Sequence, residues 1–107
     1  MKLVIVESPY AGDIEANTAY ARLCVRDSLE RGEAPIASHL LYPQPTILRE
    51  DVPAERQWGI DAGLAWRKVA ELSAFYTDRG WSRGMLAARD VLVKEGRAFE
   101  ERQLGHT

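Results

Sequence analysis

Apolar residues along the chain alternate between short continuous runs and longer segments with helical spacing. The short runs cover residues 2–6, 34–38 and 72–77. A continuous apolar run of this length is typical of a strand that is covered on both faces, as in a parallel sheet. We assign these three runs to adjacent parallel strands, and the more polar segment RAFEERQL at residues 97–104 to a final edge strand.

The longer segments predict helices at residues 14–31, 54–71 and 84–95. In the first of these, apolar residues recur at steps of three or four, which is the spacing of a buried helical face. The residues with this spacing are Ile14, Thr18, Ala21, Val25 and Leu29. Gly32 and Gly96 follow the first and the last of these helices, at positions where glycine commonly ends a helix.

The helix at residues 54–71 carries a stripe of large side chains. Its members are Trp58, Ala62, Ala65, Trp66 and Val69. Two indoles on one stripe predict either a core face or a contact with a second copy of the chain. A chain this short has limited core in which to bury both, so we expect a homodimer or a higher homo-oligomer.

The resulting order, β-α-β-loop-α-β-α-β, predicts a three-layer α/β domain with a parallel sheet of four to five strands. We expect the domain to span residues 1–104 and to be followed by a short tail at 105–107. Ligands of such sheets bind beyond the carboxyl ends of the strands. The loops at 8–13, 39–57 and 77–84 should therefore meet at one edge of the sheet and form a site.

Composition excludes several classes of function. The chain has 107 residues, 46% hydrophobic and 28% charged, with a formal net charge of −2. These values are ordinary for one globular domain and argue against nonspecific binding to nucleic acid. A single cysteine, Cys24, cannot form an intrachain disulfide or a cysteine-based zinc site. No apolar run approaches the roughly 20 residues of a membrane span, so we expect no membrane association and a cytoplasmic location.

The stretch TDRGWSRGM, at residues 77–85, has the features of an anion site. Asp78 ends a predicted strand, and Ser82 and Gly84 stand at the start of a predicted helix. Free N–H groups at a helix N-terminus, a hydroxyl and a glycine that permits close approach suit a phosphate, and Arg79 and Arg83 could add charge. Alternatively, Ser82 only caps the helix. Neither a GxGxxG nor a Walker motif is present, and we expect no cofactor.

Polar residues of the other two loops complete the candidate site. Tyr10 could stack on a base or donate its hydroxyl, or it could simply cover the end of the sheet. Asn17 could face the loops or be a solvated helix residue, whereas Asp13 fits a helix N-cap better than a catalyst. His39 suits acid–base chemistry, although a lone histidine is more often structural. No second histidine or cysteine lies at ligand spacing from it, so no metal site is expected.

These motifs together resemble a known family. The stretches SPYAGD with Asn17, PIASHLLYPQ and YTDRGWSRGM occur in this order. They are similar to small bacterial and phage proteins related to the nucleoside 2-deoxyribosyltransferases, over residues 2–104. The resemblance implies a flavodoxin-like or Rossmann-like fold. It also implies a site for a nucleoside or nucleoside monophosphate, often completed across a homodimer.

The resemblance also implies roles for individual residues. An aromatic residue near the sugar or base maps to Tyr10, and an acid that assists there maps to Asp78. The phosphate-binding serine and glycine map to Ser82 and Gly84. The remaining members of the predicted substrate-binding set are Ser8, Asn17, His39 and Met85.

One position departs from the family pattern. The resemblance implies a glutamate nucleophile four residues after Gly84, but this chain has Ala88 there. Asp90 lies two residues further on and would point roughly 200° away from residue 88 on the same helix. Alanine cannot form the covalent glycosyl intermediate that a carboxylate forms.

Two main hypotheses follow. The protein is either an enzyme acting on N-glycosidic bonds, or a sensor or sponge that holds a nucleotide-derived ligand without turning it over. In the first hypothesis Asp78, Asp90 or Glu71 would stabilise an oxocarbenium-like sugar or activate water, with Tyr10 beside the reacting group. A third possibility is a phage accessory protein with a vestigial pocket.

Overall fold

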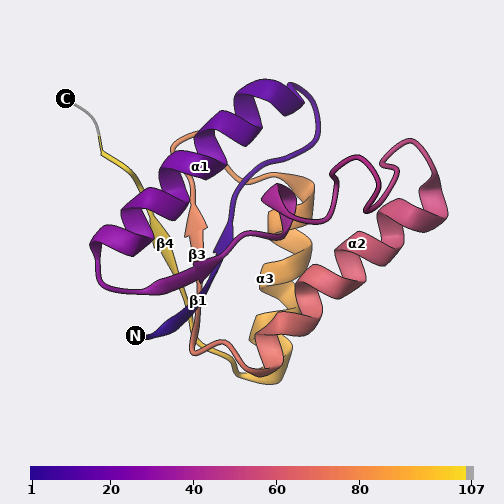
Figure 1. Cartoon of the computed structure of the whole chain (residues 1–107). Helices are drawn as coiled ribbons and strands as arrows, with labels where there is room; N and C mark the ends of the chain where they lie inside the picture. Colours follow the sequence, from indigo (N-terminus) through magenta and orange to yellow (C-terminus); the bar gives the residue numbers. More distant parts are fainter. Residues whose placement is uncertain (106–107) are drawn as a thin grey trace.

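The computed structural model describes residues 1–105 and shows a sheet flanked by helices (Figure 1). Within these residues the sheet has four strands in the order β2-β1-β3-β4, and all pairings are parallel. The strands are β1 (Leu3–Glu7), β2 (Ala34–Ile36), β3 (Leu72–Tyr76) and β4 (Phe99–Arg102). The predicted α/β fold with a parallel sheet is confirmed, and its architecture is flavodoxin- or Rossmann-like. Residues 106–107 of the predicted tail lie outside the described residues.

The two central strands are mostly apolar because both of their faces are covered. Every residue of β3 is buried, and Val4, Ile5 and Val6 of β1 are at most 5% exposed. Alternate side chains point to opposite faces of a strand. Val4 and Val6 therefore join one core cluster with Ala74, whereas Phe75 belongs to a second cluster.

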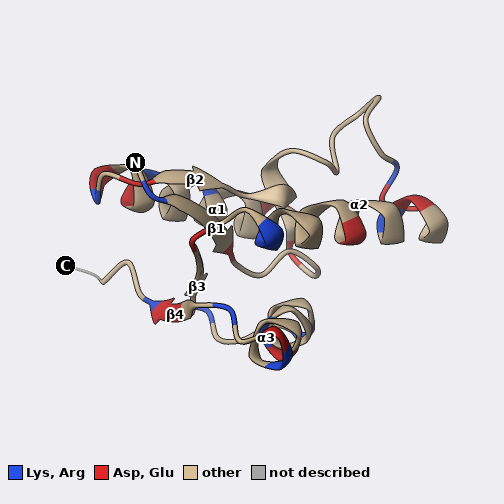
Figure 2. Ribbon diagram, turned by 90° about the horizontal axis from the view of Figure 1, so that it is seen from below, with Lys and Arg blue, Asp and Glu red and all other residues tan. Residues whose placement is uncertain are grey.

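The helices α1 (Ile14–Glu30), α2 (Pro53–Ala65) and α3 (Arg83–Glu95) cover both faces of the sheet. In Figure 1, α1 lies on one side of the strands, and α2 and α3 lie on the other. Tyr20 and Cys24 of α1 pack in the first core cluster, and Met85 and Leu92 of α3 pack in the second. Acidic and basic residues both occur along α2 and α3 (Figure 2). Among the described residues, no helix is both long enough and apolar enough to cross a membrane.

The stripe predicted for α1 is wrong at both ends. Ile14 is 45% exposed and Leu29 is 49% exposed. The buried face of α1 instead comprises Asn17, Tyr20, Ala21, Cys24 and Ser28. This face includes polar side chains that find hydrogen-bond partners, and a pattern based on apolar residues alone does not register them.

The second strand and the second helix are shorter than predicted. The strand ends at Ile36, and residues 38–40 form a 3₁₀ turn, η1 (Ser38–Leu40). The helix ends at Ala65, and the chain tightens into η2 (Trp66–Lys68). There the Arg67 guanidinium donates to the Leu64 carbonyl at 3.0 Å and pairs with Glu95 at 2.9 Å.

The tryptophans of the α2 stripe do not form a core. Trp58 is 67% exposed, Trp66 is 42% exposed and Val69 is 60% exposed. The Trp66 indole N–H donates to the Tyr42 hydroxyl at 3.0 Å. Of the two interpretations of this stripe, the core face is therefore excluded, and the contact with a second copy stays a prediction.

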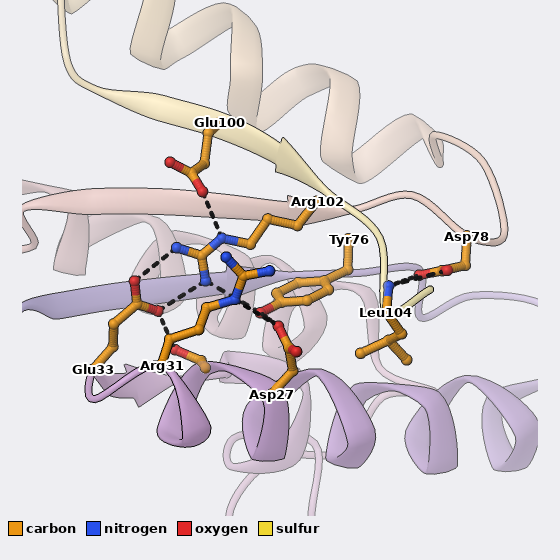
Figure 3. Close-up of polar contacts among 9 residues, drawn as sticks. Asp27, Arg31, Glu33, Tyr76, Asp78, Glu100, Arg102 and Leu104 are labelled. Atoms are coloured by element: carbon orange, nitrogen blue, oxygen red, sulfur yellow. Dashed lines mark hydrogen bonds and ion pairs between the residues drawn. The ribbon is translucent and has the colours of Figure 1, made fainter. Parts of the chain in front are cut away.

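A buried ion pair connects β4 to the segment before β2 (Figure 3). The Arg102 side chain is 4% exposed, and its guanidinium donates to both carboxylate oxygens of Glu33, at 2.8 and 2.7 Å. The same guanidinium donates to the Tyr76 hydroxyl at 3.2 Å, and that hydroxyl donates to Asp27 at 2.8 Å. The Arg102 bonds lower the pKa of Glu33 to about 2, although burial acts in the opposite direction and the Ser28 hydroxyl assists.

Candidate functional site

A cavity of about 660 Å³ lies at the carboxyl edge of the sheet. Its walls come from the end of β1, the loop after it, η1, α2 and the first half of α3. The lining side chains with polar or aromatic character are Glu7, Tyr10, Ser38, His39, Tyr42, Glu50, Arg56, Gln57, Ser82 and Arg83. The volume falls within the range of small-molecule sites, and the mixture of apolar walls with a few polar groups is typical of them.

A glycine allows α2 to approach η1 at one wall of the cavity. Gly63 is buried, and a Cβ atom placed on it would lie 2.7 Å from Cβ and Oγ of Ser38. Real Cβ atoms do not come this close, so a larger residue at position 63 would push α2 away from η1. The shape of the cavity therefore depends on Gly63.

Tyr10 and His39 form one aromatic part of the lining. Their ring centroids are 4.9 Å apart, and their planes are tilted by 42°. The buried Asn17 amide holds this loop by donating to the carbonyls of Tyr10 and Ala11, at 3.0 and 3.1 Å. Asn17 thus acts on the cavity through the backbone and does not line it. Asp13 caps α1 by accepting from the Ala16 N–H at 3.1 Å.

The surroundings of His39 favour the neutral form of its imidazole. Burial lowers its pKa, and a hydrogen bond with the backbone of Ser8 acts in the opposite direction. Ser8 itself is 1% exposed and does not line the cavity. An uncharged imidazole at neutral pH can accept or donate a hydrogen bond and can pack against a flat ligand.

The N-terminus of α3 forms another part of the lining. The Ser82 hydroxyl accepts from the Met85 N–H at 3.2 Å, so Ser82 caps the helix and also faces the cavity. Met85 is 1% exposed, belongs to the core, and approaches the Ser82 N–H with its sulfur at 3.5 Å. Within the described residues, the backbone N–H groups of Arg83 and Gly84 have no acceptor. These N–H groups therefore remain available to a bound anion.

Gly84 leaves open space at this helix end. A Cβ atom at this position would meet Ser82 Oγ at 4.0 Å and no other described atom within that distance. Neither packing nor a left-handed backbone therefore requires glycine here. The space in front of the residue opens toward the cavity that Gly84 lines.

The carboxylates that the sequence singled out lie elsewhere. Asp78 is exposed and accepts from the Tyr20 hydroxyl. It also accepts from the Leu104 N–H, as Figure 3 shows. Burial would raise its pKa, but these bonds outweigh that effect and lower it. Glu71 accepts from the Leu3 N–H at 2.8 Å, at the start of β1 and so at the opposite edge of the sheet. Asp90 is exposed on α3 and does not line the cavity, whereas Ala88 of the same helix does.

A carboxylate that sequence reasoning missed does line the cavity. Glu7 is the last residue of β1 and pairs in register with Phe75 of β3. Burial raises its pKa to about 7. The signal was visible in the sequence, because an acid directly ends the apolar run LVIV in the stretch LVIVE.

The described residues offer no metal centre. Within residues 1–105, no group of three or more histidine, cysteine, aspartate or glutamate side chains is arranged to hold a metal ion. Cys24 of α1 is buried in the first core cluster and does not line the cavity. The cavity groups that can take part in chemistry are Glu7, the His39 imidazole, the N-terminus of α3, Arg56 and Arg83.

Comparison with known proteins adds a family assignment. No curated protein and no solved structure matches the chain. A family model described as a domain of unknown function (DUF7768) matches residues 2–102. This match contains every strand of the described sheet and every residue that lines the cavity. The chain therefore belongs to the DUF7768 family.

Proposed function

We propose that the protein binds a nucleoside or a nucleoside monophosphate in this cavity. The observation that carries the proposal is the joint lining of one 660 Å³ cavity by the Tyr10–His39 pair and the N-terminus of α3. A flat heterocycle packs against aromatic and imidazole rings, and a phosphate accepts from free N–H groups at a helix N-terminus. A nucleotide contains both of these groups.

Charges around the cavity suit an anionic ligand. Arg83 and Arg56 both line it and can form charge-assisted bonds to a phosphate. Gly84 leaves room for close approach. The resemblance of the SPYAGD and YTDRGWSRGM stretches to deoxyribosyltransferase-related proteins independently favours the same ligand class.

Titration calorimetry with dAMP, dGMP, dCMP and dTMP tests this proposal. We expect at least one of them to bind, and the corresponding deoxynucleoside to bind more weakly because it lacks the phosphate. Ribose 5-phosphate is a control for phosphate recognition without a base. Failure of all nucleotides and nucleosides to bind the folded protein would refute the proposal and favour the accessory-protein hypothesis.

A non-catalytic sensor or sponge is the second candidate function. Ala88 favours it, because this residue lines the cavity at the position where the resemblance implies a glutamate nucleophile. Chromatography of a long incubation with a deoxynucleoside and a second free base distinguishes an enzyme that cleaves or exchanges the N-glycosidic bond from a non-catalytic sensor. Tight binding without any release or exchange of the base would support the sensor.

We also propose that two copies of the chain associate through α2. Trp58 and Trp66, eight residues apart on one face, are 67% and 42% exposed, and two exposed indoles on one stripe suit an apolar contact with a second copy. Light scattering should show a dimer at micromolar concentration, and Trp58→Ala should shift it toward monomer. A monomer over the whole concentration range would contradict this assembly.

A further inference from the structure

Glu7 is the cavity group that the fold itself leaves without a partner. Among the described residues, no hydrogen bond or ion pair involves its carboxylate, although its side chain is partly buried. Other glutamates near the sheet are engaged, since Glu33 pairs with Arg102 and Glu71 accepts from the Leu3 N–H. An unpaired carboxylate that faces a cavity can act on whatever enters that cavity.

The surroundings of Glu7 do not favour its ionised form. Burial is the cause of its raised pKa, and no neighbouring charge or hydrogen bond offsets it. The other titratable or charged groups along the cavity are Tyr10, His39, Tyr42, Glu50, Arg56 and Arg83. Near neutral pH the carboxyl group therefore populates both its charged and its neutral form, which suits a group that takes up and returns a proton.

Glu50, the other acid among the described lining residues, is placed differently. It lies in the long loop before α2. Burial raises the pKa of Tyr10, the charge of Glu50 raises it further, and Arg56 lowers it. Glu50 thus shares its surroundings with an arginine. Glu7 ends a central strand of the sheet and is held on a rigid element, as positioning of a reacting group requires.

We propose that Glu7 is the catalytic base of an N-glycosidic hydrolysis in this cavity, an inference that rests on the proposed nucleotide-binding function. The Glu7 carboxylate takes a proton from a water molecule as the water oxygen bonds to the anomeric carbon C1′. The electron pair of the C1′–N bond leaves with the base. The departing nitrogen takes a proton from solvent water on the opposite face of the sugar, and Glu7 releases the proton it accepted to solvent, so the products are the free base and the sugar phosphate and Glu7 is regenerated as a carboxylate.

This assignment accounts for the position of Ala88. A water-activating carboxylate needs no covalent intermediate, so the helix that lines the same cavity does not have to carry an acid. Asp78 and Asp90, which the sequence favoured, do not line the cavity.

The test measures base release and binding separately in the full chain. The four deoxynucleoside monophosphates are incubated with the wild type, Glu7→Gln and Glu30→Gln, and free base is quantified by chromatography from pH 5 to 9. Glu30 is an exposed acid at the end of α1 that does not line the cavity and, among the described residues, pairs only with the exposed Arg26, so it is the matched control. Calorimetry gives Kd for each variant, and circular dichroism verifies folding.

We expect the wild type to release base, with a rate that rises with pH and levels off above about pH 7. Glu7→Gln should lower the rate by about 10²- to 10⁴-fold while Kd changes less than about fivefold. Glu30→Gln should match the wild type. Carbon NMR of the labelled Glu7 carboxyl should show titration near neutrality, and addition of the bound nucleotide should shift its resonance.

Several results would overturn the assignment. Glu7→Gln with a wild-type rate, or with equal losses in rate and affinity, would show that Glu7 is not the base. If the Glu7 carboxyl titrated near 4.5, it would be fully ionised near neutral pH, and the chemical reason for assigning it as the base would be lost. Binding without base release by the wild type would refute the hydrolysis and leave the proposed binding function intact, whereas absence of binding would refute the proposed function itself.

Discussion

Glu7 and Glu33 are two partly buried glutamates at or beside strands of the same sheet, and their surroundings shift their pKa values in opposite directions. Glu33 precedes β2 and receives two hydrogen bonds from Arg102 and one from the Ser28 hydroxyl. Its pKa falls to about 2. Glu7 ends β1, receives no bond from the described residues, and its pKa rises to about 7.

The difference shows that the presence of partners, rather than burial alone, decides what a buried charge does for a fold. The partners of Glu33 stabilise its charged form, so the Glu33–Arg102 pair holds the segment before β2 against β4 (Figure 3). Glu7 destabilises the folded state whenever it is charged. A residue that lowers stability and faces a cavity is a candidate for function.

Removing Arg102 should cause the largest loss of stability. Arg102→Ala would leave the Glu33 carboxylate buried without its partner, and we expect a loss of about 3–5 kcal/mol in the free energy of unfolding, measured by urea denaturation. Arg26→Ala is the control, because the Arg26–Glu30 pair is exposed and should contribute less than about 1 kcal/mol. Similar losses in the two variants would contradict the importance of the buried network.

Replacing Glu7 should raise the stability of the fold, whereas replacing Arg102 lowers it. Its pKa is raised from 4.5 to about 7 in the folded state, so the wild type loses stability as pH rises through this window. Glu7→Gln should therefore be more stable than the wild type at pH 8, by on the order of 2–3 kcal/mol, and should show little gain at pH 4. Urea denaturation at both pH values measures the difference. A gain in stability that does not depend on pH would contradict the view that the unpaired charge of Glu7 destabilises the fold.

The contribution of Glu33 to stability should be lost in a different, more acidic pH window. Because its folded-state pKa is lowered, the contribution of Glu33 is present above about pH 4.5 and is lost as pH falls toward 2. The stability difference between the wild type and Glu33→Gln should shrink across that window. A difference that stays constant from pH 5 to pH 2.5 would mean that the charge of Glu33 is not what stabilises the contact.

Removing the Ser82 hydroxyl should have a smaller effect. Ser82→Ala loses the cap of α3, which should lower stability by about 1 kcal/mol. If the hydroxyl also contacts a nucleotide phosphate, affinity should fall by about 1–3 kcal/mol in addition. Thermal unfolding and calorimetry measure the two effects separately, and Ser82→Thr, which keeps a hydroxyl, should restore most of both.

Gly84→Ala should change stability least and still affect the ligand. The added methyl group meets open space in the protein, so we expect a stability within about 0.5 kcal/mol of the wild type, or a slight gain from better helix propensity. Binding of a nucleotide should weaken, because the methyl group occupies space next to the free N–H groups. Unchanged affinity would place the phosphate elsewhere in the cavity.

The sequence located the loops of the site better than it located the roles of their residues. Tyr10, His39, Ser82 and Gly84 line one cavity. Asn17 and Met85 act on it through hydrogen bonds and packing, and Asp78 faces Tyr20 and the segment after β4. Which side of its loop a side chain takes depends on partners distant in the chain, and no local pattern records them.

The sequence by itself determined the order of the elements and the parallel sheet, because continuous apolar runs joined by helical segments permit few other arrangements. It also determined the cap at Ser82 and the helix end at Gly96, which follow from local backbone geometry. The tertiary structure alone decided which charges are paired. Arg102 meets Glu33 across 69 residues, whereas no cation offsets the effect of burial on Glu7 at the end of β1. Pairing and burial depend on distances between elements, so two similar glutamates acquire opposite pKa shifts only once the chain has folded.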